Sequence, residues 1–163
     1  MIIIQSQSEV FRKGKIGLMF PQQIRVITIC IIRKGDAILV FEDVDKVTNQ
    51  IYYRPLGGGI EFGEPAAKAL IREFREELDA EIINLRYIET LENIFISDGE
   101  AGHQIVMIYK GDFADESFYN KDVIIGQEDN GQSFKALWMP IKDFQEHKFP
   151  LYPDGLRALL SKE

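Results

Sequence analysis

The order of hydrophobic and polar residues in the first third of the chain predicts β-strands. Two runs rich in β-branched residues lie within 24–44 and flank a polar turn with a glycine, so this stretch is expected to form a hairpin. Residues 50–56 predict a short strand from their aromatic and β-branched content, which Pro55 cuts short. Residues 1–20 give no clear element, although the apolar residues 17–20 are candidates for packing on the core.

A helix is predicted from residue 65 to residue 78, because the spacing of the apolar residues changes there. They recur at intervals of three and four: Ala66, Ala67, Leu70, Ile71, Phe74 and Leu78. Pro65 suits the first helical position, where its missing N–H group leaves no hydrogen bond unmade. Glu64 is then placed at or beside the helix cap, close to the positive end of the helix dipole.

The second half of the chain predicts further strands and two short helices. Two long strands, 81–96 and 103–113, are expected to be joined across 97–102, and the polar stretch 114–133 is the expected long loop. A last strand, a short helix and a terminal helix are predicted at 134–140, 141–147 and 152–162. No repeat or second domain is visible, so we expect one α/β (α+β) domain over residues 1–163, with helices packed on a mixed β-sheet.

Composition and charge limit the classes of partner. The 163 residues include 45% hydrophobic and 28% charged residues, an ordinary balance for a globular domain, and the net charge is −7. Because nucleic-acid binding normally uses clustered lysine and arginine, this charge argues against a nucleic-acid partner. A phosphorylated substrate stays open, since a bound divalent metal ion supplies the missing positive charge.

The single cysteine and the absence of long apolar runs bear on the compartment. Cys30 excludes an internal disulfide, fits a reducing compartment and lies in a β-branched run, so we expect a buried structural thiol. The first 11 residues hold a four-residue apolar run, shorter than a signal peptide needs. No stretch approaches the roughly 18 apolar residues of a membrane span. We therefore expect a cytoplasmic protein with no membrane partner.

Carboxylates are gathered toward the C-terminal end of the predicted helix. Glu73, Glu76 and Glu77 stand at positions i, i+3 and i+4 and share one face, where like charges repel by about 0.2–0.5 kcal/mol per pair. Arg72 is placed to relieve part of this repulsion through Glu76, and the simplest interpretation is a solvated charged face. The alternative is a metal site, since Mg²⁺ takes carboxylate and water oxygens and bridges them to substrate phosphates. The glycines at 57–59 favour this alternative because they let the backbone approach a metal ion and phosphates.

Residues 58–80 resemble the signature of the Nudix hydrolases. That signature reads glycine, five residues, glutamate, seven residues, and then Arg-Glu-apolar-any-Glu-Glu-any-Gly-apolar; the matching residues are Gly58, Glu64, Arg72, Glu73, Phe74, Glu76 and Glu77. A chance match of the six fixed identities at a given start has a probability on the order of 10⁻⁷ to 10⁻⁸. Two positions depart, because Asp79 replaces the family's glycine and Ala80 is a weak version of its aliphatic residue. Aspartate can adopt the left-handed conformation that such a glycine provides, at a cost of about 1–2 kcal/mol.

The resemblance implies a fold, a reaction and a metal cofactor. The fold would be the family's α/β/α sandwich, with a central catalytic helix and a C-terminal helix. The reaction would be hydrolysis of a nucleoside diphosphate linked to another group, by metal-activated water. Carried over position by position, Glu76 and Glu77 would be the principal ligands of Mg²⁺ or Mn²⁺, and the backbone carbonyl of Gly57 would be a further ligand.

The resemblance also implies supporting roles around these ligands. Glu73 would be a metal ligand or the base that accepts the proton of the attacking water, and both roles stay open. Arg72 would hold Glu73 in place, and Glu64 would support the helix start or an outer metal ion. Family members often recruit another acid from a loop before the last strand, which makes Glu128 the best candidate and Asp129 the second. A solvated loop acid is the alternative for both.

Weaker candidates for substrate binding lie outside the fixed positions of the signature. Arg54 is placed to reach a phosphate, with a surface ion pair as an equal alternative. His103, at the start of a strand near the expected cleft, is a candidate for a substrate contact, with a surface or packing role as the alternative. Phe62, with Tyr52 and Tyr53, is a candidate for base stacking, although aromatic residues in strands more often belong to the core.

Two alternatives to the hydrolase stay open: a Nudix-fold sensor that binds a nucleotide or ADP-ribose without turnover, and an RNA-end pyrophosphohydrolase. Sensors of this kind typically lose one or more signature acids, whereas this chain keeps Glu73, Glu76 and Glu77, which favours an enzyme. The acidic balance argues against an RNA substrate. The marks of the ADP-ribose, diadenosine polyphosphate and coenzyme A groups are absent, so the expected partner is a small nucleotide-type substrate with an undetermined leaving group. Family members are often homodimers, which makes a homodimer a candidate.

Overall fold

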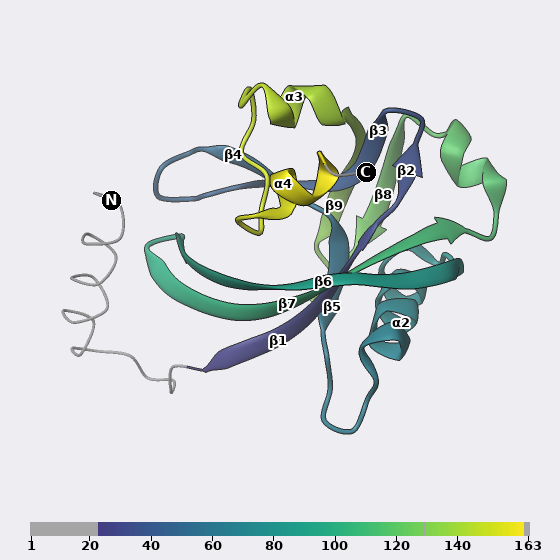
Figure 1. Ribbon diagram of the computed structural model, residues 1–163, viewed down its shortest axis with the longest axis horizontal. Helices are drawn as coiled ribbons and strands as arrows, with labels where there is room; N and C mark the ends of the chain where they lie inside the picture. Colours follow the sequence, from purple (N-terminus) through teal and green to yellow (C-terminus); the bar gives the residue numbers. More distant parts are fainter. Residues whose placement is uncertain (1–22, 129, 162–163) are drawn as a thin grey trace.

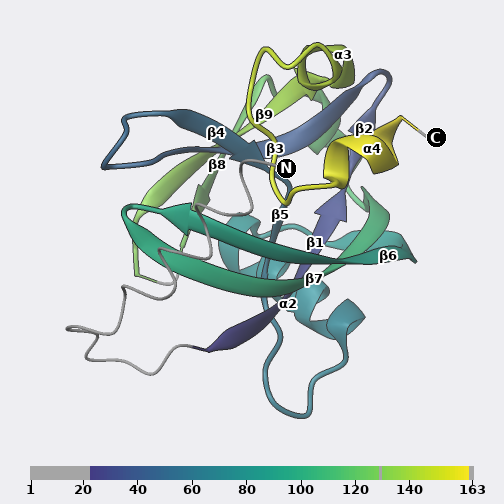
Figure 2. The same ribbon diagram turned by 60° about the vertical axis from the view of Figure 1, so that its left-hand side comes forward.

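The computed structural model describes residues 23–128 and 130–161, in which strands predominate over helices. Residues 17–20, expected to pack on the core, and Asp129, the second loop-acid candidate, lie outside the described residues. The described strands form two sheets, with α2 (Ala66–Leu78) on one side and α3 (Ile141–Gln145) and α4 (Leu156–Leu160) on the other (Figures 1 and 2). The expected α/β (α+β) class and layered architecture are confirmed, with the strands divided over two sheets.

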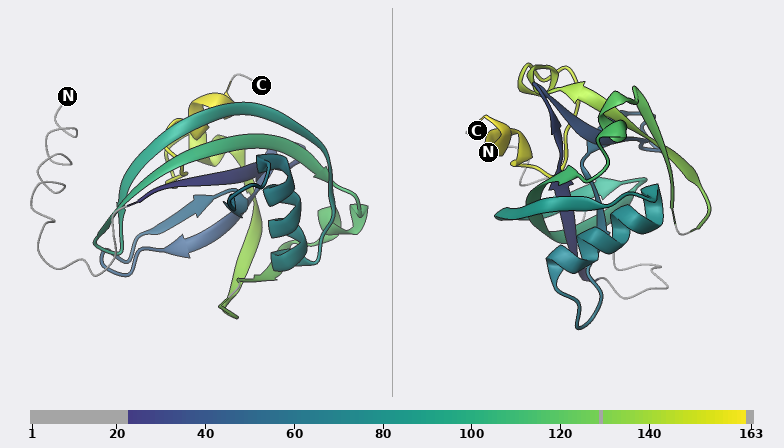
Figure 3. Two further views of the ribbon diagram at one scale, coloured as in Figure 1. Left: turned by 90° about the horizontal axis from the view of Figure 1, so that it is seen from below. Right: turned by 90° about the vertical axis from the view of Figure 1, so that its right-hand side faces the viewer.

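The first sheet is mixed. Its order is β5 (Leu56–Gly59), β1 (Ile24–Ile31), β7 (Glu100–Phe113) and β6 (Ile82–Ser97). β1 runs parallel to β7, and the other neighbours are antiparallel. The β6–β7 hairpin turns at Asp98 and Gly99, which have φ of 54° and 80°. The two strands therefore extend further into the predicted connection than expected, and Figure 3 shows them arching over the rest of the molecule.

The second sheet is antiparallel throughout. Its order is β2 (Arg33–Lys34), β3 (Ala37–Val44), β9 (Ser133–Pro140) and β8 (Val123–Gln127). A fifth strand, β4 (Ile51–Arg54), also pairs with β3. β4 ends before Pro55, as predicted, because proline has no N–H group to donate to a neighbouring strand. The chain then continues as β5, a strand that the glycine-rich sequence did not reveal.

The expected hairpin over 24–44 is wrong for most of its length. β1 pairs with β5 and β7 in the first sheet, and only the two residues of β2 pair with β3. The turn itself is correct, since Gly35 has a φ of 57°. β-branched runs favour strands without specifying their partners. The C-terminal half of β1 is buried without a break, as suits a strand inside a sheet.

The expected long loop at 114–133 is also partly wrong. It contains a 3₁₀ helix, η1 (Glu116–Asn120), and the strand β8. Phe118 and Ile124 in these two elements are buried, so the polar composition of the segment conceals two apolar anchors. The predicted strand at 134–140 is present as β9, and the two helices after it are shorter than predicted.

Core residues lie on both faces of β3. Leu39 and Phe41 pack in one cluster with Phe74 of α2, whereas Ile38 and Val40 pack in a second cluster with residues of α3 and α4. Cys30 belongs to the first cluster, as predicted, and its burial raises the pKa of the thiol, so that it stays protonated and unreactive.

None of the described helices is long and apolar enough to cross a membrane. The cytoplasmic location stays a prediction.

Candidate active site

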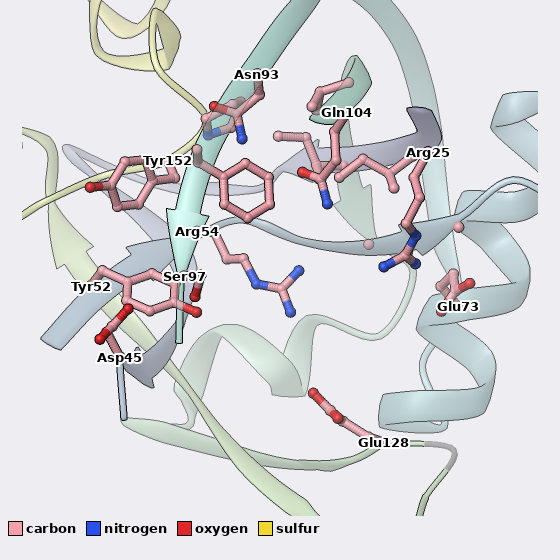
Figure 4. Close-up of a pocket in the computed structure, with 18 of the residues that line it drawn as sticks. Arg25, Asp45, Tyr52, Arg54, Glu73, Asn93, Ser97, Gln104, Glu128 and Tyr152 are labelled. Atoms are coloured by element: carbon pink, nitrogen blue, oxygen red, sulfur yellow. The ribbon is translucent and has the colours of Figure 1, made fainter. Parts of the chain in front are cut away.

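A cleft of about 490 Å³ opens where the two sheets meet the N-terminal approach to α2. Its walls come from β1, β4, β6 and β7, from the glycines of β5, and from the segment between α3 and α4. Figure 4 shows Glu73 at one end, and Tyr52 and Tyr152 at the other. The cleft therefore contains the expected acidic site together with groups that the sequence did not connect to it.

The helix α2 presents the acidic residues. It begins one residue later than predicted, because Pro65 is extended, with φ of −66° and ψ of 141°, and serves as the N-cap. Leu70 and Phe74 are buried against the core, which directs the neighbouring turn of the helix toward the cleft. Glu73 is only 9% exposed, and both Glu73 and Glu77 line the cleft.

Asp79 ends this helix in the left-handed conformation, with φ of 50° and ψ of 40°. Its N–H group donates to the carbonyl of Arg75 at 3.1 Å, and the N–H group of Ala80 donates to the carbonyl of Phe74 at 3.2 Å. Two of the helix's last carbonyl groups are thereby satisfied. Aspartate thus provides the turn for which the signature uses glycine.

Glycines in β5 make room for Glu73. A Cβ atom at Gly58 would lie 2.3 Å from the Glu73 Cδ atom and within 2.5 Å of both carboxylate oxygens. Gly57 has a φ of 143°, and a Cβ atom there would lie 2.1 Å from the carbonyl oxygen of Thr28. Gly58 therefore lets β5 and α2 approach each other more closely than a larger residue would permit, and Gly57 does the same for β5 and β1.

Arg72 connects the carboxylates of this region. Its Nε and Nη2 atoms donate to the two oxygens of Glu64 at 3.1 and 3.0 Å, and Nη1 donates to Glu73 at 2.9 Å and to Glu76 at 3.1 Å. Nη2 also donates to the carbonyl oxygen of Gly59 at 3.0 Å. The hydrogen bonds that Glu64 accepts from Arg72 lower the pKa of Glu64, and hydrogen bonding to the carboxylates of Glu64, Glu73 and Glu76 raises the pKa of Arg72. Arg72 and Glu64 are consequently charged near neutral pH.

The donor chemistry at this end fits a hard divalent cation. Glu73, Glu77 and Gly57 all line the cleft and offer only oxygen atoms, and Figure 4 shows Glu128 on the facing wall. Glu76 is instead turned toward Arg72 and does not line the cleft. Within residues 23–128 and 130–161, no three His, Cys, Asp or Glu side chains stand close enough together to hold one metal ion. Binding an ion would therefore require side-chain rotation about this oxygen-rich centre.

Two arginines lie between the acidic end and the rest of the cleft. Figure 4 shows the guanidinium groups of Arg54 and Arg25 reaching toward its centre from opposite walls. Arg54 also lies over the ring of Phe41, with 4.8 Å between its Cζ atom and the ring centroid. In the part of the chain that the structure describes, neither arginine forms an ion pair. Both are therefore placed to bind an anionic ligand.

Two other predicted substrate contacts lie away from the cleft. The Nε2 atom of His103 lies 2.8 Å from an Oε1 atom of Glu92, and His103 is not among the lining residues. Phe62 is fully exposed in the connection between β5 and α2 and is not a lining residue either. Tyr53 is 5% exposed and packs in the core, whereas Tyr52 lines the cleft and donates to Asp43 at 2.8 Å. Burial and this hydrogen bond raise the pKa of Tyr52 to about 12.

Sequence reasoning missed several groups that line the cleft. They are Arg25 near the acidic end and, farther from it, Gln104, Asn93, Phe95, Ser97 and Tyr152. They lie on β1, β6, β7 and the segment before α4, spread over most of the described chain. Spacing along the sequence gives no sign that they meet. The positions of the lining residues along β6 and β7 become informative only once the pairing of those strands is known.

Comparisons with known proteins agree with this arrangement. The chain matches the family model for the NUDIX domain over residues 21–159. It is structurally similar to a NUDIX hydrolase from Nitrosomonas europaea, with 16% identity over 86% of this chain and 87% of that chain and a TM-score of 0.59. It is also similar to a MutT NUDIX hydrolase from Burkholderia pseudomallei, with 17% identity over 85% of this chain and 96% of that chain and a TM-score of 0.58. A NUDIX-family hydrolase from Clostridium perfringens is similar as well, with 17% identity over 86% of this chain and 93% of that chain and a TM-score of 0.55. At these identities the structural similarity establishes the fold alone. No curated protein matches the chain.

Proposed function

The chain belongs to the NUDIX family and is a pyrophosphohydrolase, and we propose that it cleaves a pyrophosphate bond in a nucleoside diphosphate-linked small molecule with Mg²⁺ as cofactor. Mn²⁺ is the alternative ion. The observation that carries the proposal is the arrangement at the acidic end of the cleft, where Arg72 holds Glu73 against Gly58 beside Glu77.

The acidic residues of α2 would hold the metal ion. Glu76 and Glu77 are the proposed principal ligands, with Glu73 and the carbonyl oxygen of Gly57 completing the oxygen set; Glu128 is a further candidate from the facing wall. For Glu76 to serve, its carboxylate must exchange its hydrogen bond with Arg72 for the metal ion. When bound, the ion neutralises pyrophosphate oxygens and acidifies the attacking water.

Residues around these ligands would bind and orient the substrate. Arg54 and Arg25 are placed to bind phosphate oxygens, because they enter the cleft between the acidic end and the remote end. The alternative role for Glu73 is to accept the proton from the attacking water in place of binding the ion, and Glu128 is the other candidate base. Arg72 keeps the Glu73 carboxylate aimed through one fixed hydrogen bond, and Glu64 in turn fixes Arg72 through two.

The direct test is product release from nucleoside triphosphates, nucleotide sugars, ADP-ribose and dinucleoside polyphosphates, with Mg²⁺, with Mn²⁺ and with chelator. Turnover should require the metal ion and should fall on the order of a hundredfold or more in Glu77→Gln. Glu81→Gln is the matched control, since Glu81 is an exposed acid outside the cleft. Calorimetric Mn²⁺ binding gives a second measurement and should weaken in Glu77→Gln alone.

Four results would contradict the proposal. Metal-independent turnover, or turnover unchanged in Glu77→Gln, would remove α2 from the reaction. Tight binding of one panel member without cleavage would favour a nucleotide sensor, and cleavage confined to RNA ends would favour the RNA-end pyrophosphohydrolase.

A further inference from the structure

We propose that the end of the cleft remote from α2 is a nucleobase subsite, in which the side-chain amides of Gln104 and Asn93 hydrogen-bond the edge of the base. This inference rests on the proposed function in one respect: the base is taken to belong to the same molecule whose pyrophosphate lies at the acidic end. It assigns the orientation of the substrate and the residues that would select it.

The two amides form a direct cross-strand pair. Asn93 of β6 is the partner of Gln104 of β7 in an antiparallel register, and both side chains line the cleft. Directly opposed residues of an antiparallel pair project from the same face, with Cβ atoms about 4.5–5.5 Å apart. The pair therefore presents two amide groups side by side, and Figure 4 shows both above the centre of the cleft.

Most of the hydrogen-bonding capacity of this pair is unused. An amide side chain offers two N–H donors and a carbonyl acceptor with two lone pairs. The Oδ1 atom of Asn93 accepts from the N–H group of Asp154 at 3.4 Å. In the described part of the chain, no group accepts from the Nδ2 atom of Asn93 and no group bonds to the amide of Gln104. Neither amide is among the fully buried polar atoms without a partner, so the unused donors and acceptors are open to the cleft. A ligand with donors and acceptors along one edge would bond to them in place of solvent.

Aromatic side chains supply flat walls beside the amides. Phe95 lies two residues after Asn93 on β6, and its ring occupies the space that a side chain at Gly102 would fill, 2.3 Å from the position of a Cβ atom. Tyr152 lies against Tyr52 with ring centroids 5.7 Å apart and planes at 76°. The N–H group of Tyr152 donates to the carbonyl of Tyr53 at 2.9 Å, which fixes its place in the wall. Flat walls of this kind stack on bases.

The order of charges along the cleft favours an uncharged ring at this end. Arg25, Gln104 and Asn93 stand in register on three neighbouring strands. Figure 4 shows Glu73 beside Arg25 at one end, Gln104 and Arg54 in the middle, and Asn93 with the tyrosines at the other end. One acid, Asp45, does line the remote end, but its carboxylate already accepts four hydrogen bonds, from Val47, Thr48 (two) and Asp98. Phosphates placed between the arginines and the acidic end would leave the base among the amides. A planar ring with donors and acceptors along its edge uses both the paired amides and the flat walls, which is the chemistry of a nucleobase.

The test compares nucleoside triphosphates with 5-phosphoribosyl 1-pyrophosphate, a pyrophosphate ester that has no base, in the full chain. Gln104→Glu and Gln104→Ala are the variants; Gln145→Glu is the matched control, because Gln145 is exposed and lies outside the cleft. Both Gln104 variants should raise KM for the preferred nucleotide about tenfold, with kcat within about twofold. KM for the base-free substrate should not change, and the control should leave both values unchanged.

A second measurement separates this inference from the proposed hydrolysis. Binding of the uncharged nucleosides adenosine, guanosine, cytidine and uridine is followed by calorimetry without metal. We expect one nucleoside to bind wild-type protein and to lose at least about tenfold in affinity in both Gln104 variants. If a nucleoside binds in this way but no substrate is hydrolysed, the nucleobase subsite is supported and the proposed hydrolysis is contradicted. Hydrolysis that is indifferent to the base and to both Gln104 variants would overturn the subsite and leave the hydrolase intact. Equal increases in KM for substrates with and without a base would also overturn it.

Discussion

Arg72 shows how one residue organises the acidic end of the cleft. A guanidinium group has five N–H donors, and Arg72 uses all five. Two donate to Glu64, and one each donates to Glu73, to Glu76 and to the backbone carbonyl of Gly59. The planar fork fixes both the distance and the angle of each carboxylate. Lysine has three donors on a flexible stem and could not hold the same set. Arg72 therefore positions the acids and has no donor left for substrate.

Gly58 provides a sharp test of how closely Glu73 must be held. The Gly58→Ala change places a methyl group 2.3 Å from the Glu73 carboxylate, so Glu73 must move away. We expect kcat/KM to fall roughly 10–100-fold, because misplacing a reacting group by about 1 Å costs this much. Gly59→Ala is the neighbouring comparison, since the nearest atom to its new methyl group is 3.8 Å away. Equal activity losses in the two variants, measured on well-folded protein, would show that the crowding at Glu73 is unimportant.

Asp79 tests whether the departure from the signature matters. Its left-handed φ of 50° suits glycine better than aspartate, and it lies at the end of α2 away from the cleft lining. We expect Asp79→Gly to leave activity intact and not to lower the melting temperature. Asp79→Ala should lower it by a few degrees at most, because alanine meets the steric cost of about 1–2 kcal/mol without the local hydrogen bonding by which an aspartate side chain reduces it. A folded but inactive Asp79→Gly variant would assign Asp79 a role in the reaction.

At the scale of elements, the remote wall of the cleft depends on a link between two turns. Asp45 follows β3, and its Oδ2 atom accepts from the N–H group of Asp98 in the β6–β7 turn at 2.8 Å. Asp98 reciprocates, because its Oδ1 atom accepts from the N–H group of Lys46 at 2.7 Å. Tyr52 and Ser97 stand next to these turns and line the cleft. The link therefore holds the two sheets together where the proposed base would enter.

The link predicts a pH dependence with a definite sign. Backbone hydrogen bonds, first from Thr48 and then from Asp98, lower the pKa of Asp45 from 3.8 to about 2. A depressed carboxyl pKa contributes stability that is present above the unfolded value and is lost as the pH falls through the folded value. The melting temperature should therefore fall between about pH 4 and pH 2, partly through Asp45.

Asp45→Asn should lower the melting temperature at neutral pH and flatten its decline between pH 4 and pH 2, because asparagine cannot accept on both side-chain atoms. It should also raise KM more than it lowers kcat, since the proposed base subsite would loosen. Asp122→Asn, an exposed acid outside the cleft, is the control. An Asp45→Asn profile parallel to that of wild type would rule out the link as the source of this dependence.

At the scale of the molecule, the two ends of the cleft differ in how far they could be predicted. Glu73, Glu76 and Glu77 share one helix, whose geometry fixes their common face, so their gathering could be predicted from spacing. Their role at the acidic end was predicted from the resemblance of residues 58–80 to the Nudix signature. The remote end joins β6, β7 and the segment before α4, and it exists only because Asn93 pairs with Gln104. Strand propensity does not specify partner or register. For the same reason β1 was assigned to the wrong partner.

A metal ion should stabilise the whole molecule if the acidic residues bind it. A ligand at 100 times its Kd, binding only the folded state, adds about 2.7 kcal/mol to the free energy of unfolding. For a chain of this size that corresponds to a rise of roughly 5–11 °C in the melting temperature. Because the net charge is −7, added salt also weakens self-repulsion, so NaCl at equal ionic strength is the necessary control. Mg²⁺ should raise the melting temperature beyond NaCl in wild type and in Glu81→Gln, but much less in Glu77→Gln. A rise that NaCl reproduces, or one that survives Glu77→Gln, would mean that α2 does not hold the ion.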